Sequence, residues 1–143
     1  MRKRAFTLIE LLIVIAIIVI LVSMSVPMFK RNQLMAQLAR VTTDLNAIKT
    51  ASIMLYSSTD EWPPTGNNGD GLINSINITN LNNWRGPYIE EWRNDPWGNA
   101  YTMYDHGSYP LRRYIKSLGP DKDDDGDSGE DDIRLLITPN ITR

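Results

Sequence analysis

Several residue types are missing or scarce in this chain of 143 residues, and each absence excludes a class of function. There is no cysteine, which rules out disulfide bonds and thiolate metal sites. The single histidine, His106, stands between Asp105 and Gly107, where we expect a turn and interpret it as an exposed loop residue. The formal net charge of −2 argues against a nucleic-acid partner. The length leaves room for one small domain beside a long uncharged segment.

The most informative absence is that of charge between Leu11 and Phe29, a stretch of 19 residues. As an α-helix it would be about 28 Å long, close to the thickness of the hydrocarbon core of a bilayer. Basic residues 2–4 precede it, so we expect everything after Phe29 to lie outside the cytoplasm. The sequence therefore predicts one membrane-spanning helix at residues 6–29, in which Glu10 is the only ionisable side chain near the start.

The N-terminal sequence Arg2-Lys3-Arg4-Ala5-Phe6-Thr7-Leu8-Ile9-Glu10-Leu11 resembles the class III signal of type IV pilins and type II secretion pseudopilins. The resemblance implies that a prepilin peptidase cuts between Ala5 and Phe6. Residues 1–5 are then a leader peptide, and the new amine of Phe6 is methylated. Gly is usual before the cut in this family, whereas this chain has the small residue Ala5. A secretory signal peptide cleaved near residues 23–25 and a plain single-pass anchor are the alternatives, and the anchor leaves Glu10 unexplained.

Glu10 needs a partner, because a carboxylate near the end of a membrane helix is costly to bury. Cleavage before Phe6 would create a cationic amine four residues away, and in low-dielectric surroundings the two charges would stabilise each other. The amine belongs either to the same helix or, as the resemblance implies, to a neighbouring subunit during assembly. The sequence does not decide between these geometries. The resemblance assigns Phe6 and Glu10 to assembly.

Pro27 stands inside what otherwise reads as one continuous helix. Its ring removes an amide donor and clashes with the carbonyl one turn earlier, so we expect a kink or a loosened turn at residues 23–27. The family also carries a proline here, and the resemblance implies that this region unwinds in assembled filaments. A tolerated proline kink near the end of a membrane helix is the alternative.

From residue 34 onward, apolar residues recur at alternating intervals of four and three, which predicts an amphipathic helix with one buried face. The stripe consists of Leu34, Leu38, Val41, Leu45, Ile48, Ser52 and Leu55. Pro63 and Pro64 should end the helix near residues 57–60. Together with the membrane segment it makes a helix of roughly 50 residues, about 75 Å long if straight.

Three short segments have strand character, at residues 100–104, 113–118 and 133–137. A tight turn at residues 105–110 would join the first two, so we expect an antiparallel meander. Its apolar face would cover the helix stripe, which predicts an α+β fold. The resemblance implies that this fold is pilin-like. The globular domain would extend over residues 30–143 and include the amphipathic helix to about residue 58.

Two loop blocks precede these strands, at residues 84–89 and 95–101. They look like the loop of the major pseudopilin of type II secretion, where similar Gly-Pro-Tyr and Asp-Pro-Trp-Gly-Asn strings recur. From the residues alone, Asp95-Pro96 and Gly98-Asn99 are turn formers around an anchoring Trp97, so we interpret the block as structural.

Residues 121–132 hold eight acidic groups and one lysine. Negative charge at this density repels itself unless a cation or water relieves it. Every potential ligand is a hard oxygen, which favours Ca²⁺ over zinc or copper, and the loop suits calcium better than strictly octahedral magnesium. Calcium would then have a structural role, because its binding energy adds to the stability of the folded domain.

The two ends of this loop resemble the calcium loop of the major pseudopilin. The ligands so implied are the Leu118 carbonyl and the carboxylates of Asp121, Asp131 and Asp132. A second set follows the EF-hand spacing, although the last position is Asp rather than Glu and strands flank the loop. It consists of Asp121, Asp123, Asp125, Gly126 and Asp132. We favour the first set. A solvated acidic loop without a specific metal is the third interpretation.

No nucleophile–base pair or histidine cluster accompanies the acids, so we expect no enzyme, with a metal-dependent hydrolase as the counter-hypothesis. The chain is identified as a member of the major pseudopilins. The resemblance implies a single-pass inner-membrane subunit with a periplasmic domain, polymerising into a helical filament that drives type II protein secretion. Its implied partners are the prepilin peptidase, the inner-membrane assembly platform and minor pseudopilins. The alternatives are a surface type IV pilin for adhesion or twitching, and a monomeric membrane-tethered calcium-binding module.

Overall fold

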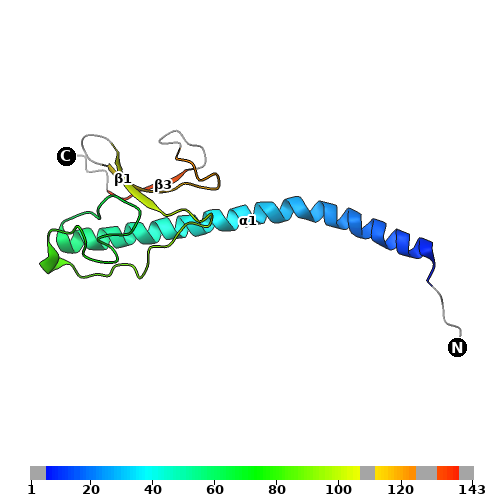
Figure 1. The fold of residues 1–143 in the computed structure, drawn as a ribbon, viewed down its shortest axis with the longest axis horizontal. Helices are drawn as coiled ribbons and strands as arrows, with labels where there is room; N and C mark the ends of the chain where they lie inside the picture. The colour runs from blue at the N-terminus through cyan, green and yellow to red at the C-terminus, as the bar shows by residue number, and fades with distance from the viewer. Residues whose placement is uncertain (1–5, 107–111, 125–131, 139–143) are drawn as a thin grey trace, which may run out of the picture. The chain divides into compact units, whose positions relative to one another are not determined.

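The computed structural model describes residues 6–106, 112–124 and 132–138, with only the backbone of residues 24–28. These residues form one long helix, one short 3-10 helix and three strands (Figure 1). The elements are α1 (Leu8–Thr59), η1 (Leu81–Asn83), β1 (Thr102–His106), β2 (Arg112–Ser117) and β3 (Ile133–Leu136). The predicted α+β class, a long N-terminal helix with a small antiparallel sheet, is confirmed.

Helix α1 contains 52 residues, which confirms the predicted length of the combined helix. It ends at Thr59, inside the predicted range, and Asp60 follows with a left-handed φ of 61°. The Asp60 amide donates to the Tyr56 carbonyl at 2.8 Å, so one of the last carbonyls of the helix keeps a partner. The helix assignment includes Pro27, and the kink expected there stays a prediction.

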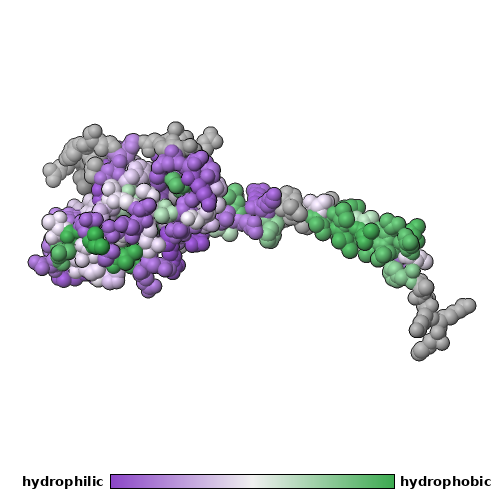
Figure 2. Space-filling model, in the orientation of Figure 1, coloured by the Kyte–Doolittle hydropathy of each residue, from purple (hydrophilic) through white to green (hydrophobic). Residues whose placement is uncertain are grey.

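The chain divides into two compact units, Met1–Leu38 and Ala39–Arg143. In the first unit every Leu, Ile, Val and Phe from Phe6 to Val22 is exposed, by 45% to 78%. Figure 2 shows the hydrophobic surface of this part of the helix. Within the part of the chain that the structure describes, no helix combines the length and the apolarity that a membrane crossing needs. The membrane-spanning segment predicted at residues 6–29 therefore stays a prediction.

The core of the second unit forms between the C-terminal part of α1, the sheet and the loop that connects them. The predicted stripe is buried from Val41 to Leu55, where both of these side chains are fully enclosed. The prediction is wrong for Leu34, which is 43% exposed, because Leu34 belongs to the first unit and the covering sheet and loop belong to the second. The core cluster consists of Val41, Leu45, Ile48, Ala51, Leu55, Leu72, Ile78, Tyr101, Met103, Ile115 and Ile137.

The three strands form one antiparallel sheet in the order β1-β2-β3. Each strand lies within two residues of its predicted range. Met103 pairs with Ile115, and both are buried in the core with α1, which confirms that the apolar face of the sheet covers the helix. One assignment is corrected: His106 is exposed as expected but is the last residue of β1, paired with Arg112, because the ladder continues beyond Asp105. The rest of the predicted turn, residues 107–110, lies outside the described residues.

The long loop between α1 and β1 is held by its indole groups. Trp84 Nε1 donates to the Gly71 carbonyl at 2.9 Å, and Trp92 Nε1 donates to the Tyr101 carbonyl at 3.1 Å. Trp97 is partly buried against the core, as its anchoring role predicted. This loop has little regular structure, but its backbone is held in place because its indole N–H groups are hydrogen-bonded and its aromatic rings pack against the core.

Candidate functional site

The N-terminal site is built by Thr7 and Glu10 at the start of α1. Thr7 donates to Glu10 Oε2 twice, from its amide at 2.9 Å and from its hydroxyl at 2.8 Å. In return the Glu10 amide donates to Thr7 Oγ1 at 3.3 Å. This reciprocal arrangement is a capping box, which satisfies amides that have no partner within the helix.

The capping box gives Glu10 a local role beside the assembly role predicted from its charge. Thr7 was not predicted as a site residue, although the Thr-x-x-Glu spacing before an apolar run is its signature. Of the other predicted site residues, Phe6 is 74% exposed, and Ala5 lies outside the described residues. The structure thus places Phe6, Thr7 and Glu10 at one accessible helix start.

The second site is centred on Asp95, which is buried with 4% exposure at the start of the Asp-Pro-Trp-Gly-Asn turn. Its Oδ1 accepts from the amides of Trp97 at 3.0 Å and Asn99 at 2.8 Å. Its Oδ2 accepts from Asn99 Nδ2 at 3.1 Å and from Ser117 Oγ at 2.6 Å. A buried carboxylate with four donors is well satisfied, so the turn and the end of β2 are fixed to each other.

The same network reaches the first residues of the acidic loop. Asn99 Nδ2 donates to the Gly119 carbonyl at 2.9 Å, and the Gly119 amide donates to Ser117 Oγ at 3.2 Å. Gly119 has a left-handed φ of 73°, a conformation that a side chain would strain. Sequence reasoning recognised this block as a turn but missed its function, because the link from residue 95 to residue 117 is set by tertiary packing.

Lys116 on β2 supplies a positive charge beside the start of the acidic loop. Its side chain is only 9% exposed, its Nζ forms an ion pair with Asp124, and the same Nζ lies 5.3 Å from the centre of the Tyr104 ring. Tyr104 in turn stacks on Tyr114, with ring centres 5.7 Å apart. A lysine buried in this way needs both partners, because its charge is otherwise poorly solvated.

The predicted calcium ligands are only partly described. Leu118, Asp121, Asp123 and Asp132 lie within the described residues, whereas Asp125 and Asp131 lie outside them. Asp121 Oδ1 accepts from the Asp123 amide at 3.1 Å, and both carboxylate oxygens of Asp132 are buried. Among the residues described, no three acidic or histidine side chains gather closely enough to hold a metal ion. The donor set nevertheless fits calcium chemically, because it offers only hard oxygens and includes the buried carboxylate of Asp132.

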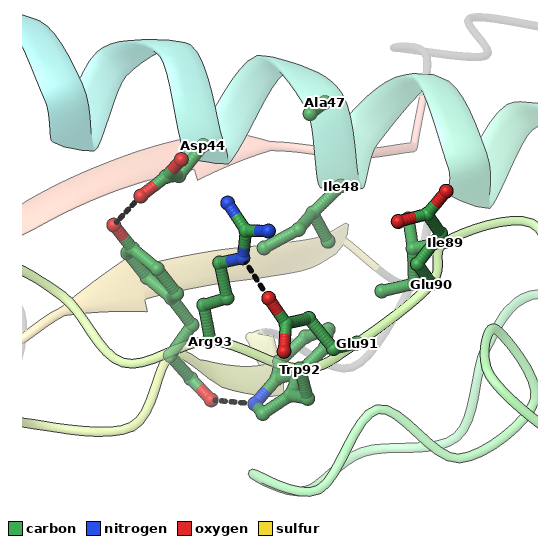
Figure 3. A pocket seen from close by; sticks show the side chains of 9 residues that line it. Asp44, Ala47, Ile48, Ile89, Glu90, Glu91, Trp92 and Arg93 are labelled. Carbon is green, nitrogen blue, oxygen red and sulfur yellow. Dashed lines mark hydrogen bonds and ion pairs between the residues drawn. The ribbon is translucent and has the colours of Figure 1, made fainter.

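A pocket of about 240 Å³ lies between α1 and residues 89–93 (Figure 3). Its lining consists of Asp44, Ala47, Ile48, Ile89, Glu90, Glu91, Trp92, Arg93 and Tyr101. Arg93 is ion-paired with Glu91, and the Tyr101 hydroxyl donates to Asp44 Oδ2 at 2.9 Å. Burial first, and then the hydrogen bond to Asp44, raise the pKa of the Tyr101 phenol well above its ordinary value. The Tyr101–Asp44 hydrogen bond joins α1 to the residue directly before β1, whereas the Arg93–Glu91 ion pair lies within the loop.

Two family models match the chain. One, described as the prokaryotic N-terminal methylation motif, matches residues 1–26, and the other, described as PilW, C-terminal, matches residues 34–118. Together with the long helix and the small sheet, they define a pilin-like protein with an N-terminal methylation motif.

Curated relatives and a solved structure identify the family. Type II secretion system core protein G of Escherichia coli K12 is 33% identical over 138 residues, which cover 92% of this chain and 90% of that protein. The core protein G of Aeromonas hydrophila is also 33% identical, and the match covers 92% of this chain and 90% of that protein. The major pseudopilin of enterohaemorrhagic Escherichia coli superposes with a TM-score of 0.57 at 28% identity, covering 72% of this chain and 85% of that one. The chain belongs to the family of type II secretion system core protein G, the major pseudopilins.

Proposed function

We propose that this major pseudopilin polymerises through its N-terminal helix into a periplasmic filament that drives type II protein secretion. The observation that carries the proposal is the exposure of every large apolar side chain from Phe6 to Val22. Apolar surface in water costs about 25 cal/mol per Å², so a surface of this extent needs a lipid or protein partner. Membrane lipid would cover this surface before assembly, and neighbouring copies of the chain would cover it after assembly.

Processing would prepare the helix for assembly. The methylation motif at residues 1–26 supports cleavage between Ala5 and Phe6 by a prepilin peptidase, followed by methylation of the new amine. That amine would stand next to the Glu10 carboxylate of its own or of a neighbouring subunit. Opposite charges held in an apolar filament core stabilise each other more than in water, which would favour subunits in register.

In this proposal the subunit is held in the inner membrane, with the domain from residue 30 onward in the periplasm. The basic residues 2–4 before the apolar segment support this orientation. An inner-membrane assembly platform and minor pseudopilins would be its partners besides other copies of the chain. The role is structural and not enzymatic, in keeping with relatives that are named as a core protein and a pseudopilin.

The acidic loop would bind one structural calcium ion through the Leu118 carbonyl, Asp121, Asp131 and Asp132, with Asp123 and Asp125 as alternative ligands. The hard oxygens of the loop and the buried carboxylate of Asp132 support this assignment. The Asp95 network supports it as well, because it fixes Gly119, the residue that follows Leu118. Calcium would supply the charge that relieves the repulsion within the loop.

The test of processing and assembly uses the full chain in a host with a type II secretion system. Intact-mass measurement should find a chain that begins at Phe6 and carries one methyl group, and electron microscopy should find filaments that contain it. A host lacking prepilin peptidase is the control and should give the full-length chain without filaments. A mature chain that begins near residue 26 would overturn the proposal, because it would indicate an ordinary secretory signal peptide.

A further inference from the structure

The proposed function assigns no role to Lys116, and neither calcium ligand set includes it, yet its position is unusual for a lysine. It is 7% exposed on β2, and lysine is almost never buried at this level without a partner. Its register partner on β1 is Thr102, and the next residue along that face, Tyr104, is the ring beside its ammonium group. The Tyr104–Tyr114 stack holds this ring across the two strands.

The ammonium group is therefore set between a fixed aromatic ring and the carboxylate of Asp124. Asp124 itself is 58% exposed, so the pair has one buried and one solvated member. The segment between the two residues is already anchored at its start, where Ser117 and Gly119 join the Asp95 network. The ion pair ties down the other end of the same segment.

We propose that Lys116 is a built-in counter-cation that holds Asp124, and with it residues 119–124, against β2 without a metal ion. Asp124 is then a structural partner of Lys116 and not a calcium ligand. The role of Lys116 as counter-cation is independent of the proposed function, whereas the exclusion of Asp124 from the calcium ligands rests on that function. Lys116 is a positioning residue for the acidic loop.

Charge explains why such a residue is useful here. The sequence places eight acids within residues 121–132, a density of negative charge that repels itself, and the loop's own lysine, Lys122, is exposed. A buried ammonium acts on Asp124 more strongly than an exposed one, because less water screens it. It keeps the start of the loop ordered and leaves the remaining acids for a divalent cation.

The test compares Lys116→Met with Lys122→Met in the full chain in detergent with chelator, with melting followed by tryptophan fluorescence. All four tryptophans lie in the unit Ala39–Arg143, so the signal reports this unit. Both variants lose one positive charge, but only the first loses the buried pair. We expect Lys116→Met to lower Tm by about 5 °C or more and Lys122→Met by less than about 2 °C. Lys116→Arg should restore most of the loss.

Asp124→Asn keeps the test decisive if Lys116→Met fails to fold, because Asp124 is mostly exposed. It should lower Tm in chelator more than Asp123→Asn does, and its effect should not add to that of Lys116→Met. Equal effects of Lys116→Met and Lys122→Met, or additive effects of Lys116→Met and Asp124→Asn, would overturn the proposal.

Calcium separates this proposal from the proposed metal site. With calcium added, Asp124→Asn should show at least the Tm rise of the wild-type chain, and loss of that rise would show that Asp124 is a ligand. If calcium leaves the wild-type Tm unchanged, the metal site fails while the result in chelator still decides the role of Lys116.

Discussion

Ser117 Oγ donates a hydrogen bond of 2.6 Å to Asp95 Oδ2 and thereby joins the end of β2 to a turn 22 residues earlier in the chain. Both residues are buried. The bond fixes the point where the acidic loop leaves the sheet, since the Ser117 hydroxyl also accepts from the Gly119 amide. The Asp-Pro-Trp-Gly-Asn block is therefore the support of the loop and not only a turn.

Asp95→Ala should be strongly destabilising, by about 2 to 4 kcal/mol, because it removes the acceptor of the buried Ser117 hydroxyl and of the part-buried amides of Trp97 and Asn99. Ser117→Ala should cost only about 1 kcal/mol, since Asp95 keeps its other donors. Urea denaturation of the full chain in detergent measures both. Asp70→Ala is the control, because Asp70 also accepts from two amide side chains, Asn68 and Asn77, but at the surface. A cost for Asp95→Ala no larger than that of the control would contradict the supporting role.

Tyr101 gives the domain a dependence on alkaline pH. Its pKa is raised in the folded state by burial and by the hydrogen bond to Asp44, so the folded chain keeps this proton where the unfolded chain loses it. The contribution to stability is complete below about pH 10, the ordinary pKa of tyrosine, and declines as the pH rises above that value. Unfolding measured from pH 8 to 11 should show this decline in the wild-type chain.

Tyr101→Phe should remove the hydrogen bond to Asp44, cost about 1 kcal/mol near neutral pH and flatten the alkaline decline. Tyr114→Phe serves as the control, because Tyr114 lies outside the core cluster and its ring can stay stacked on Tyr104. An alkaline decline that is equally steep in Tyr101→Phe would show that another group causes it.

Calcium should raise the Tm of the wild-type chain, and magnesium at the same concentration should have a much smaller effect. The double variant Asp121→Ala, Asp132→Ala should lose this rise, because it removes two of the proposed ligands. Glu90→Ala, which removes an exposed carboxylate outside the loop, should keep it. Asp123→Ala separates the two ligand sets, since it should keep the rise under the favoured set and reduce it under the EF-hand set. A double variant that responds like the wild type would refute both assignments.

The sequence predicted the features that depend on local pattern. The spacing of apolar residues located the buried stripe from Val41 to Leu55, and Pro63 and Pro64 marked the helix end that the structure places at Thr59. The predicted strand bounds were close to the observed ones, because alternation of apolar and polar side chains reflects the burial of one face of a strand. The error at Leu34 arose because periodicity shows which face is apolar but not where the covering sheet stops.

Contacts between distant residues could not be predicted in this way. Asp95 and Ser117, or Arg40 and the Asn94 carbonyl, meet only because the loop packs on α1 and the sheet, and no spacing in the sequence encodes that. Lys116 is another example, since an alternating strand pattern favours a solvated lysine and the structure buries it. The capping box of Thr7 and Glu10 is different, because its signature is local and was overlooked in favour of the charge of Glu10.

The most direct test of the central claim uses Glu10→Gln, with filaments counted by electron microscopy in a secretion-competent host. Gln can retain the capping box with Thr7 but removes the charge that would pair with the amine of Phe6. Thr7→Ala is the matched control, because it breaks the capping box and keeps the carboxylate. We predict that Glu10→Gln abolishes filaments while Thr7→Ala still forms them. Normal filaments from Glu10→Gln, together with their loss in Thr7→Ala, would contradict assembly through the charge of Glu10 and leave it only a helix cap.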